Sequence, residues 1–229
     1  MVSAVAALAG LLFGFDTGII SGALLFIEKD FTISTFMKEL IVSSVLLGAM
    51  LGSLCSGILT DHFGRRRVML LISSFFVIGT MISSLAYQVE GLLVGRLLIG
   101  FAIGMGSYTA PLYIAEVSPQ ELRGGLVSLN QLAITIGIFC SFLINYAFTN
   151  IDGSWRWMFA IGLFPAVLLS VGMIYLPESP RWLLKNNKED KAMQILRHLR
   201  NTLDVTNEIN DIKHTLKVKK AHVNPLFLL

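Results

Sequence analysis

Charged residues are scarce in this chain. Asp, Glu, Lys and Arg make up 14% of its 229 residues, and hydrophobic residues make up 54%. In an ordinary soluble domain roughly a quarter of the residues are charged, so the balance excludes that class and predicts a membrane protein. The formal charge of +3 is not gathered into a basic patch with exposed aromatic residues, and we expect no nucleic-acid partner.

Cysteine and histidine are also rare. Both cysteines, Cys55 and Cys140, fall inside apolar runs, where a thiol packs as a small apolar group and a disulfide framework has no role. The four histidines lie outside those runs and show neither metal-ligand spacing nor a serine partner within the membrane. They are His62, His198, His214 and His222. We therefore expect no enzyme, no metal site and no organic cofactor.

Long apolar runs separated by short polar loops fill most of the chain. Crossing a hydrocarbon layer of about 30 Å takes roughly 20 helical residues, and six runs are long enough. They lie near residues 4–27, 40–60, 68–87, 92–114, 126–148 and 157–176. The first run follows no Lys or Arg and is too long for the core of a signal peptide, so we expect it to be retained as a span.

Basic residues are divided unevenly between alternate loops. On one side lie Arg65, Arg66, Arg67, Arg123, Arg181 and the basic tail, and on the other only Lys29, Lys38 and Arg156. Because cytoplasmic loops carry the excess of Lys and Arg, the sequence predicts a multi-pass protein of the plasma (cell inner) membrane with its N-terminus in the cytoplasm.

The chain becomes charged after Tyr175. Apolar side chains then recur at helical spacing in two groups, which predicts short amphipathic helices on the cytoplasmic side. The groups are Ala192, Ile195, Leu196 and Leu199, then Val205, Ile209, Ile212 and Leu216. We expect a transmembrane bundle over 1–180 and an intracellular helical segment over 181–229. The final residues, HVNPLFLL, are too few to span, and we expect the chain to be interrupted before a second bundle.

The loop between the second and third runs reads GILTDHFGRRRVML. Asp61 ends a span, Gly64 permits a tight turn, Arg65 and Arg66 begin a cationic cluster, and we expect Gly57 to let a neighbouring helix approach. The pattern G-x-x-x-D-x-x-G-R-R resembles a loop of the major facilitator superfamily that forms part of its cytoplasmic gate.

Other stretches are similar to the sugar porter family of that superfamily. They are GFDTGIISGAL, GRLLIGFAIG, PLYIAEVSPQELRGGLVSLNQLAITIGI and PESPRWLL. The resemblance covers residues 4 to 220 and matches the N-terminal half of a twelve-helix transporter. It implies an all-α membrane protein with six transmembrane helices as a 3+3 repeat, half of the full fold, plus short cytoplasmic amphipathic helices.

Asp16 places a carboxylate within the first apolar run. A charge at the bilayer centre costs about 3 kcal/mol or more, so such a residue is by default functional. Asp16 lies about 16 Å from the expected outer end of its helix. Arg96 lies nearer that end of the fourth run, and its long side chain could cross much of the gap. The resemblance implies that Asp16 and Arg96 couple transport to protons; a purely structural ion pair is the alternative.

Sugar binding requires groups that both donate and accept hydrogen bonds, and an aromatic surface. Gln131 matches a family position that hydrogen-bonds the sugar, and Phe13 matches an aromatic position close to it. At Ile138 some family members carry a second Gln and others an Ile. The resemblance therefore implies Phe13, Gln131 and Ile138 as substrate-site residues without identifying the sugar. For Gln131, a hydrogen bond between helices is the alternative.

Charged residues on the cytoplasmic side complete the candidate gate. The resemblance implies that carboxylates and guanidiniums from several loops pair there and hold the inside closed. These residues are Asp61, Gly64, Arg65, Arg66, Glu116, Arg123, Glu178 and Arg181. Exposed pairs contribute about 0 to 1 kcal/mol each, but a network of several can bias a conformational equilibrium.

The sequence thus predicts transport of a monosaccharide or polyol, by proton symport with alternating access. Because only one half of the implied fold is present, we expect the partner to be a complementary six-helix half or a second copy within the lipid bilayer. A membrane sugar sensor or an inactive truncated product is the alternative.

Overall fold

The computed structural model describes residues 2–149, 151, 153–202 and 204–222, with side chains described as far as residue 216. All regular elements in these residues are helices. They form two compact units, Met1–Leu176 and Pro177–Leu229. The first unit contains all the long apolar helices.

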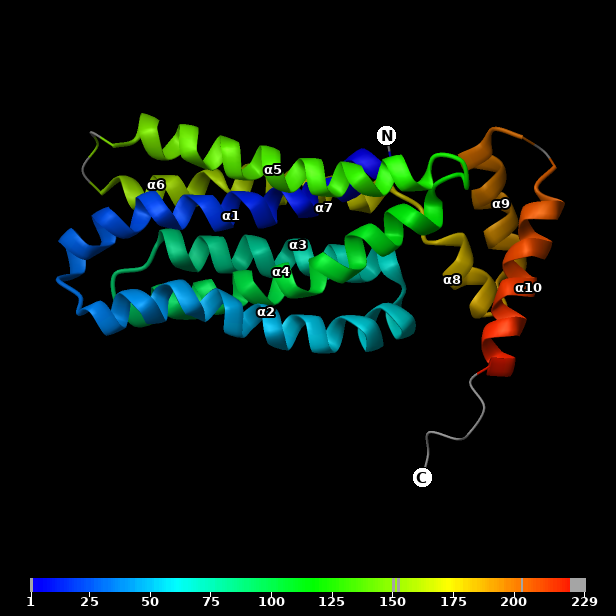
Figure 1. Cartoon of the computed structure of the whole chain (residues 1–229), viewed down its shortest axis with the longest axis horizontal. Coiled ribbons are helices and arrows are strands. Elements are labelled where there is room, and N and C mark those ends of the chain that lie inside the picture. The colour runs from blue at the N-terminus through cyan, green and yellow to red at the C-terminus, as the bar shows by residue number, and fades with distance from the viewer. Residues whose placement is uncertain (1, 150, 152, 203, 223–229) are drawn as a thin grey trace, which may run out of the picture. The chain divides into compact units, whose positions relative to one another are not determined.

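Six helical segments in the first unit are long and apolar enough to cross a membrane, which confirms the six predicted spans. They are α1 (Val2–Phe31), α2 (Thr35–Phe63), α3 (Arg65–Ser84), α4 (Val89–Val117), α5 (Arg123–Ala147), and the pair α6 (Ser154–Ile161) and α7 (Leu163–Tyr175) (Figure 1). The first two helices run several residues beyond the predicted spans. His62, which lies outside the predicted span near 40–60, thus belongs to the last turn of α2.

The sixth span is broken at Gly162 into α6 and α7. Pro165 has no backbone N–H, so the carbonyl of Ile161 lacks the helical partner that it would find there. At the same point, Gly162 N–H donates to Phe159 O at 2.9 Å. This bond spans three residues, as in a 3₁₀-helix, where an α-helix would span four. The sequence did not predict this break.

The turn between α2 and α3 consists of Gly64 alone. Its backbone has φ 92°, which glycine adopts without strain, and its N–H donates to Thr60 O. The predicted tight turn is therefore confirmed, and it places Arg65 at the first position of α3.

Glycines bring α1 against α5 and α4 against α2 at backbone contact distance. A Cβ atom at Gly14 would lie 1.9 Å from Ile134 O, and one at Gly104 would lie 2.1 Å from Ala49 O. Gly100 on α4 and Gly48 and Gly52 on α2 face backbone carbonyls just as closely, whereas Gly18 and Gly22 on α1 face the side chains of Ser141 and Asn145. Side chains larger than hydrogen would separate these helices.

The two glycine contacts reveal the internal repeat. The most extensive helix contacts are α2 with α4 and α1 with α5, and Figure 1 shows both pairs side by side. Matching the first three spans to the last three exchanges one pair for the other. The 3+3 arrangement is the repeat found within each half of major facilitator transporters, as the sequence predicted.

Gly57 does not have its expected role. A Cβ atom there would meet no atom within 4 Å. Gly57 lies five residues after Gly52, or about 140° further round the helix, so it faces away from α4. The prediction of close helix approach at Gly57 is wrong within this bundle.

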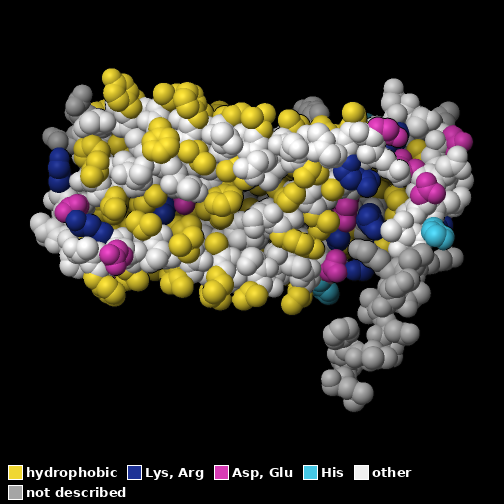
Figure 2. Space-filling view, viewed as in Figure 1, with side chains coloured by type: hydrophobic (Ala, Val, Ile, Leu, Met, Phe, Trp, Pro, Cys, Tyr) yellow, Lys and Arg dark blue, Asp and Glu magenta, His cyan; other side chains and the backbone are white. Residues whose placement is uncertain are grey.

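The outward faces of α2 and α5 are apolar and exposed. Exposed side chains on α2 are Leu46, Leu47, Met50, Leu54 and Ile58, and on α5 they are Leu132, Ile136, Phe139 and Leu143. In Figure 2, hydrophobic side chains are spread along the middle of the six-helix unit, whereas most charged side chains gather at its ends. This distribution suits a body surrounded by hydrocarbon along its middle.

The second unit contains α8 (Pro180–Lys185), α9 (Glu189–Arg200) and α10 (Thr206–His222). The last two confirm the predicted amphipathic helices, while α8 was not predicted. Ser179 Oγ accepts a hydrogen bond from Trp182 N–H at 3.2 Å and so caps α8. A shared cluster holds the three helices together: Trp182, Leu183, Leu184, Ala192, Leu196, Val205 and Ile209.

Polar contacts support the second unit. Arg200 forms a two-point ion pair with Glu208, at 2.7 and 3.1 Å. Asp204 accepts a hydrogen bond from Thr206 N–H at 3.1 Å at the start of α10, which lowers the pKa of this exposed carboxyl. The final residues, 223–229, lie outside the described part, as does the predicted interruption of the chain.

The glycine contacts can be tested by enlarging one of them. Gly14→Leu should lower the thermal unfolding midpoint of the detergent-purified chain, because its side chain collides with the backbone of α5; overpacking costs about 1 to 3 kcal/mol or more. Gly57→Leu is the matched control, since space is open there. Equal midpoints for the two variants would contradict the close contact.

Candidate functional site

Asp16 and Arg96 meet in the interior of the six-helix unit. Arg96 Nη1 donates to Asp16 Oδ1 at 2.7 Å. The two residues are only 3% and 2% exposed. The arginine side chain reaches the carboxylate, as the sequence predicted. Each charge neutralises the other at a place where solvent has almost no access.

The surroundings of Arg96 are otherwise poor in acceptors. Its Nε has no hydrogen-bond partner in the part of the chain that the structure describes. Its Cζ lies 5.7 Å from the centre of the Phe159 ring of α6. Asp16 is therefore the main partner of a buried cation, and such a pair is destabilised strongly when one member is removed.

A cavity of about 460 Å³ opens among α1, α4 and α5, and its lining includes Phe13 and Gln131. Ser107, Ser128 and Asn130 supply further polar groups, and no charged side chain lines it. The remaining lining residues are Ala9, Gly10, Gly106, Pro111, Val127 and Ile134. The structure thus places two predicted substrate residues in one uncharged cavity.

Ile138 does not belong to that lining. It lies about two turns beyond Gln131 on α5, and its carbonyl accepts a hydrogen bond from Ser141 Oγ at 2.6 Å. Asn130 and Ser128 were not singled out from the sequence. Their signal was available, since polar side chains cluster at 128, 130 and 131 in an apolar run.

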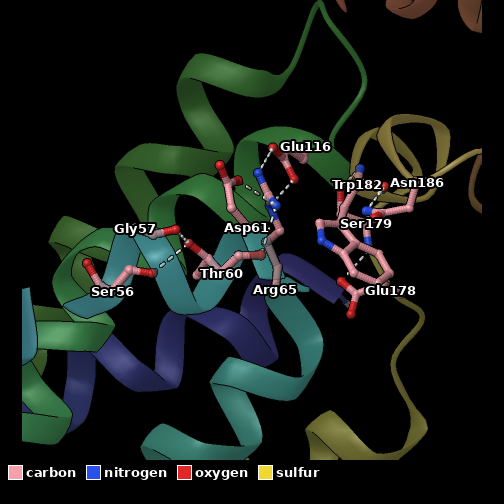
Figure 3. A network of polar contacts seen from close by, with 10 residues as sticks. All are labelled: Ser56, Gly57, Thr60, Asp61, Arg65, Glu116, Glu178, Ser179, Trp182 and Asn186. Carbon is pink, nitrogen blue, oxygen red and sulfur yellow. Dashed lines mark hydrogen bonds and ion pairs between the residues drawn. The ribbon is translucent and has the colours of Figure 1, made fainter. Parts of the chain in front are cut away.

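Arg65 forms the centre of the polar contacts at the α2–α3 turn. Its Nε lies 2.8 Å from Glu116 Oε2, and its Nη2 donates to Glu116 Oε1 at 3.1 Å. Its Nη1 also donates to Thr60 O at 3.0 Å and lies 3.4 Å from Asp61 Oδ1 (Figure 3). The Arg65 and Glu116 side chains are 8% and 5% exposed, so this two-point pair is stronger than a surface ion pair.

Arg66 joins α3 to the end of α7. Its Nε donates to Met173 O at 3.1 Å, and its Nη2 donates to Ile174 O. The last carbonyls of a helix lack partners within the helix and attract cations. Arg66 therefore satisfies the C-terminal end of the sixth span.

The other predicted gate residues are distributed over both units. Arg123 begins α5, and its buried Nε finds no hydrogen-bond partner among the described residues. Glu178 and Arg181 belong to the second unit, where Glu178 Oε1 accepts a hydrogen bond from Ser179 N–H at 2.8 Å. The structure thus brings Asp61, Arg65 and Glu116 together; a shared gate with the others stays a prediction.

A second polar cluster, at the opposite ends of these helices, was missed from the sequence. Asp30 at the end of α1 accepts a hydrogen bond from Trp155 Nε1 at 2.7 Å and one from Arg156 Nη1 at 3.3 Å. Arg156 Nη2 also donates to Ala86 O, at 3.1 Å. The sequence features that could have indicated this cluster are an acidic residue at the end of one span and a Trp-Arg pair at the start of another.

Together, the six apolar helices, their 3+3 repeat and the buried ion pair define an integral membrane protein with half of a major facilitator fold. The described residues contain no group of metal-ligating side chains. A family model described as "Sugar (and other) transporter" matches residues 2–229. The chain belongs to this family, whose members are transporters and not enzymes.

Individual relatives agree with this assignment. The chain is 45% identical to the glucose transporter GlcP of Staphylococcus epidermidis, over 94% of the chain and 48% of the relative. It is 42% identical to the galactose-proton symporter of Escherichia coli, over 94% of the chain and 47% of the relative.

Solved structures of a related transporter agree with this assignment. The proton:xylose symporter XylE, bound to 6-bromo-6-deoxy-D-glucose, superposes with a TM-score of 0.90 at 31% identity, over 99% of this chain and 55% of that one. The partially occluded inward-open form of XylE from Escherichia coli gives 0.88. The chain spans about half the length of the curated relatives that it matches.

Breaking the buried pair should be costly. Arg96→Met leaves the Asp16 carboxylate without its partner, and we expect a loss of about 3 to 5 kcal/mol of stability. Asp16→Asn combined with Arg96→Met removes both charges and should recover most of that loss. Thermal unfolding of the purified chain measures both variants, and an equal loss in single and double variants would contradict the mutual dependence.

Proposed function

We propose that this chain forms the N-terminal six-helix half of a transporter that carries a neutral monosaccharide or polyol together with a proton. The main support for this proposal is that the buried Asp16–Arg96 pair lies in the same bundle as an uncharged polar cavity. The relatives named as a galactose-proton symporter and a proton:xylose symporter support both parts of the proposal.

The cavity has the chemistry that a sugar requires. Gln131 and Asn130 each offer an amide that donates and accepts, and Ser128 adds a hydroxyl. Phe13 supplies an apolar face for the C–H side of a sugar ring. Because no charged side chain lines the cavity, it suits a neutral polyhydroxyl substrate better than a sugar acid.

Asp16 supplies the proton site. Burial of a carboxylate favours its neutral form, whereas a guanidinium at hydrogen-bond distance favours its ionised form. A small change in contact between Asp16 and Arg96 therefore shifts the balance between the two forms. Proton uptake and release follow when access alternates between the two sides of the membrane.

The gate residues determine which side is open. Arg65 and Glu116 pair through two contacts at the end of the bundle where Asp61 and Arg66 also lie. Arg123, Glu178 and Arg181 extend this network in the complete transporter. Substrate binding shifts the equilibrium only by its difference in affinity for the two states, so the gate pairs must favour the closed state by no more than that difference.

The gate end faces the cytoplasm in this proposal, with the N-terminus on the same side. The arginines at that end satisfy the positive-inside rule for a plasma membrane protein. A complementary six-helix half, or a second copy, covers the exposed side of Gln131 and completes the substrate site, since such sites lie between two halves.

Uptake measurements test the proton role. The chain is expressed in transporter-deficient cells, alone and with the C-terminal half of the galactose-proton symporter. We expect uncoupler-sensitive accumulation of radiolabelled sugar in the second case. Asp16→Asn should abolish accumulation against a gradient but spare sugar exchange. Absent uptake by membrane-inserted protein in both cases would contradict transport, and accumulation by Asp16→Asn would contradict the proton role.

Gln131→Ala tests the substrate cavity. Loss of one amide hydrogen bond should weaken sugar affinity about 5- to 20-fold, while the amount of protein in the membrane stays the same. Leu132→Ala is the control, because Leu132 is exposed on the same helix and does not line the cavity. An unchanged sugar affinity in Gln131→Ala would contradict sugar binding by Gln131 and favour a role in helix packing.

A further inference from the structure

Phe159 is the aromatic neighbour of the buried Arg96. Its ring centre lies 5.7 Å from Arg96 Cζ, within the distance of about 6 Å at which a ring face attracts a cation. Phe159 is 2% exposed and Arg96 equally so. Without water between them, the attraction is stronger than it would be at a surface.

Arg96 has few other partners. Asp16 is the one acidic side chain within 4.0 Å of it among the described residues, and Arg96 Nε makes no hydrogen bond there. The other charged side chains of α1 to α7 lie in the first or last two turns of their helices. They are Glu28, Lys29, Asp30, Lys38, Glu39, Asp61, His62, Arg65, Arg66, Arg67, Glu90, Glu116, Arg123 and Arg156. When Asp16 becomes neutral, no other charged side chain of these helices compensates for it, and the Phe159 ring face still attracts the cation.

The Phe159 ring is itself fixed in place. Trp155 packs one turn away with ring centres 6.4 Å apart and an interplanar angle of 82°, an edge-to-face arrangement that aromatic pairs favour. The Trp155 indole donates to Asp30 at 2.7 Å and is fully buried. The ring that faces Arg96 is therefore anchored to the Asp30 end of the bundle.

We infer that Phe159 is a positioning residue for proton coupling: it holds the Arg96 guanidinium in place when Asp16 is protonated. This role rests on the proposed function, since it matters only if Asp16 exchanges protons. With Asp16 ionised, the guanidinium is held chiefly by the carboxylate. With Asp16 neutral, the ring face keeps the cation close enough for the ion pair to form again.

A double-mutant cycle tests the inference on the full chain in detergent. Asp16→Asn represents the neutral carboxyl, and Phe159→Leu removes the ring face while keeping an apolar side chain. We expect Phe159→Leu to lower the thermal midpoint by at least about 3 °C more in the Asp16→Asn background than in the unchanged chain. An equal decrease in both backgrounds would show that the ring only packs, and would overturn the inference.

Two further variants separate attraction from packing. Phe159→Tyr retains the ring face and should show no such coupling to Asp16→Asn. Phe76→Leu is the matched control, because Phe76 is 3% exposed and no cation lies over its ring in the described residues. The double variant Asp16→Asn/Phe159→Leu could fail to accumulate in membranes while Asp16→Asn/Phe76→Leu accumulates. That result would also support the inference, because it would show a stronger coupling between Asp16 and Phe159.

The cycle measures unfolding and requires no transport. A coupling between Asp16 and Phe159 without any uptake would therefore contradict the proposed transport while leaving the contact between ring and cation in place. Uptake without coupling would leave transport standing and remove Phe159 from its mechanism.

Discussion

The close contact of helix backbones at glycine determines the arrangement on which the site depends. Lipid chains are as apolar as leucine, so helices in a membrane associate through tight packing and polar contacts. Asp16 lies between Gly14 and Gly18, both in contact with α5, and Arg96 directly follows Gly95, which contacts α3. The ionisable groups are therefore carried by two helices that pack closely on their neighbours at glycine, next to the 2.7 Å contact between Asp16 and Arg96.

Much of this arrangement could be predicted from the sequence. Span number follows from the length of apolar runs, because a hydrocarbon layer of fixed thickness requires helices of fixed length. The buried pair could be predicted because two opposite charges in otherwise apolar helices have few alternatives to each other. Gly64 was recognisable because a single residue joins two helices there, and only glycine adopts φ 92° without strain.

The failures came from features that depend on three-dimensional direction. Gly57 looked like other small residues in the spans, but a stretch of sequence does not show which face of a helix meets a neighbour. The cavity includes Asn130 and excludes Ile138 because its walls come from three helices whose relative rotation is not encoded locally. Asp30 and Ala86 are far from Arg156 in sequence, and only the folded chain reveals that both contact it.

Polar contacts at opposite ends of the six-helix unit have a mechanical consequence. Arg66 fixes α3 to carbonyls in the last turn of α7, and Arg156 fixes α6 to Asp30 of α1 and to Ala86, which follows α3. Bundles that are cross-linked at both ends resist bending and twisting more than bundles joined at one end. A force applied at one membrane surface would then turn the six helices as a stiff lever, and little of the displacement would be lost to elastic deformation along the way.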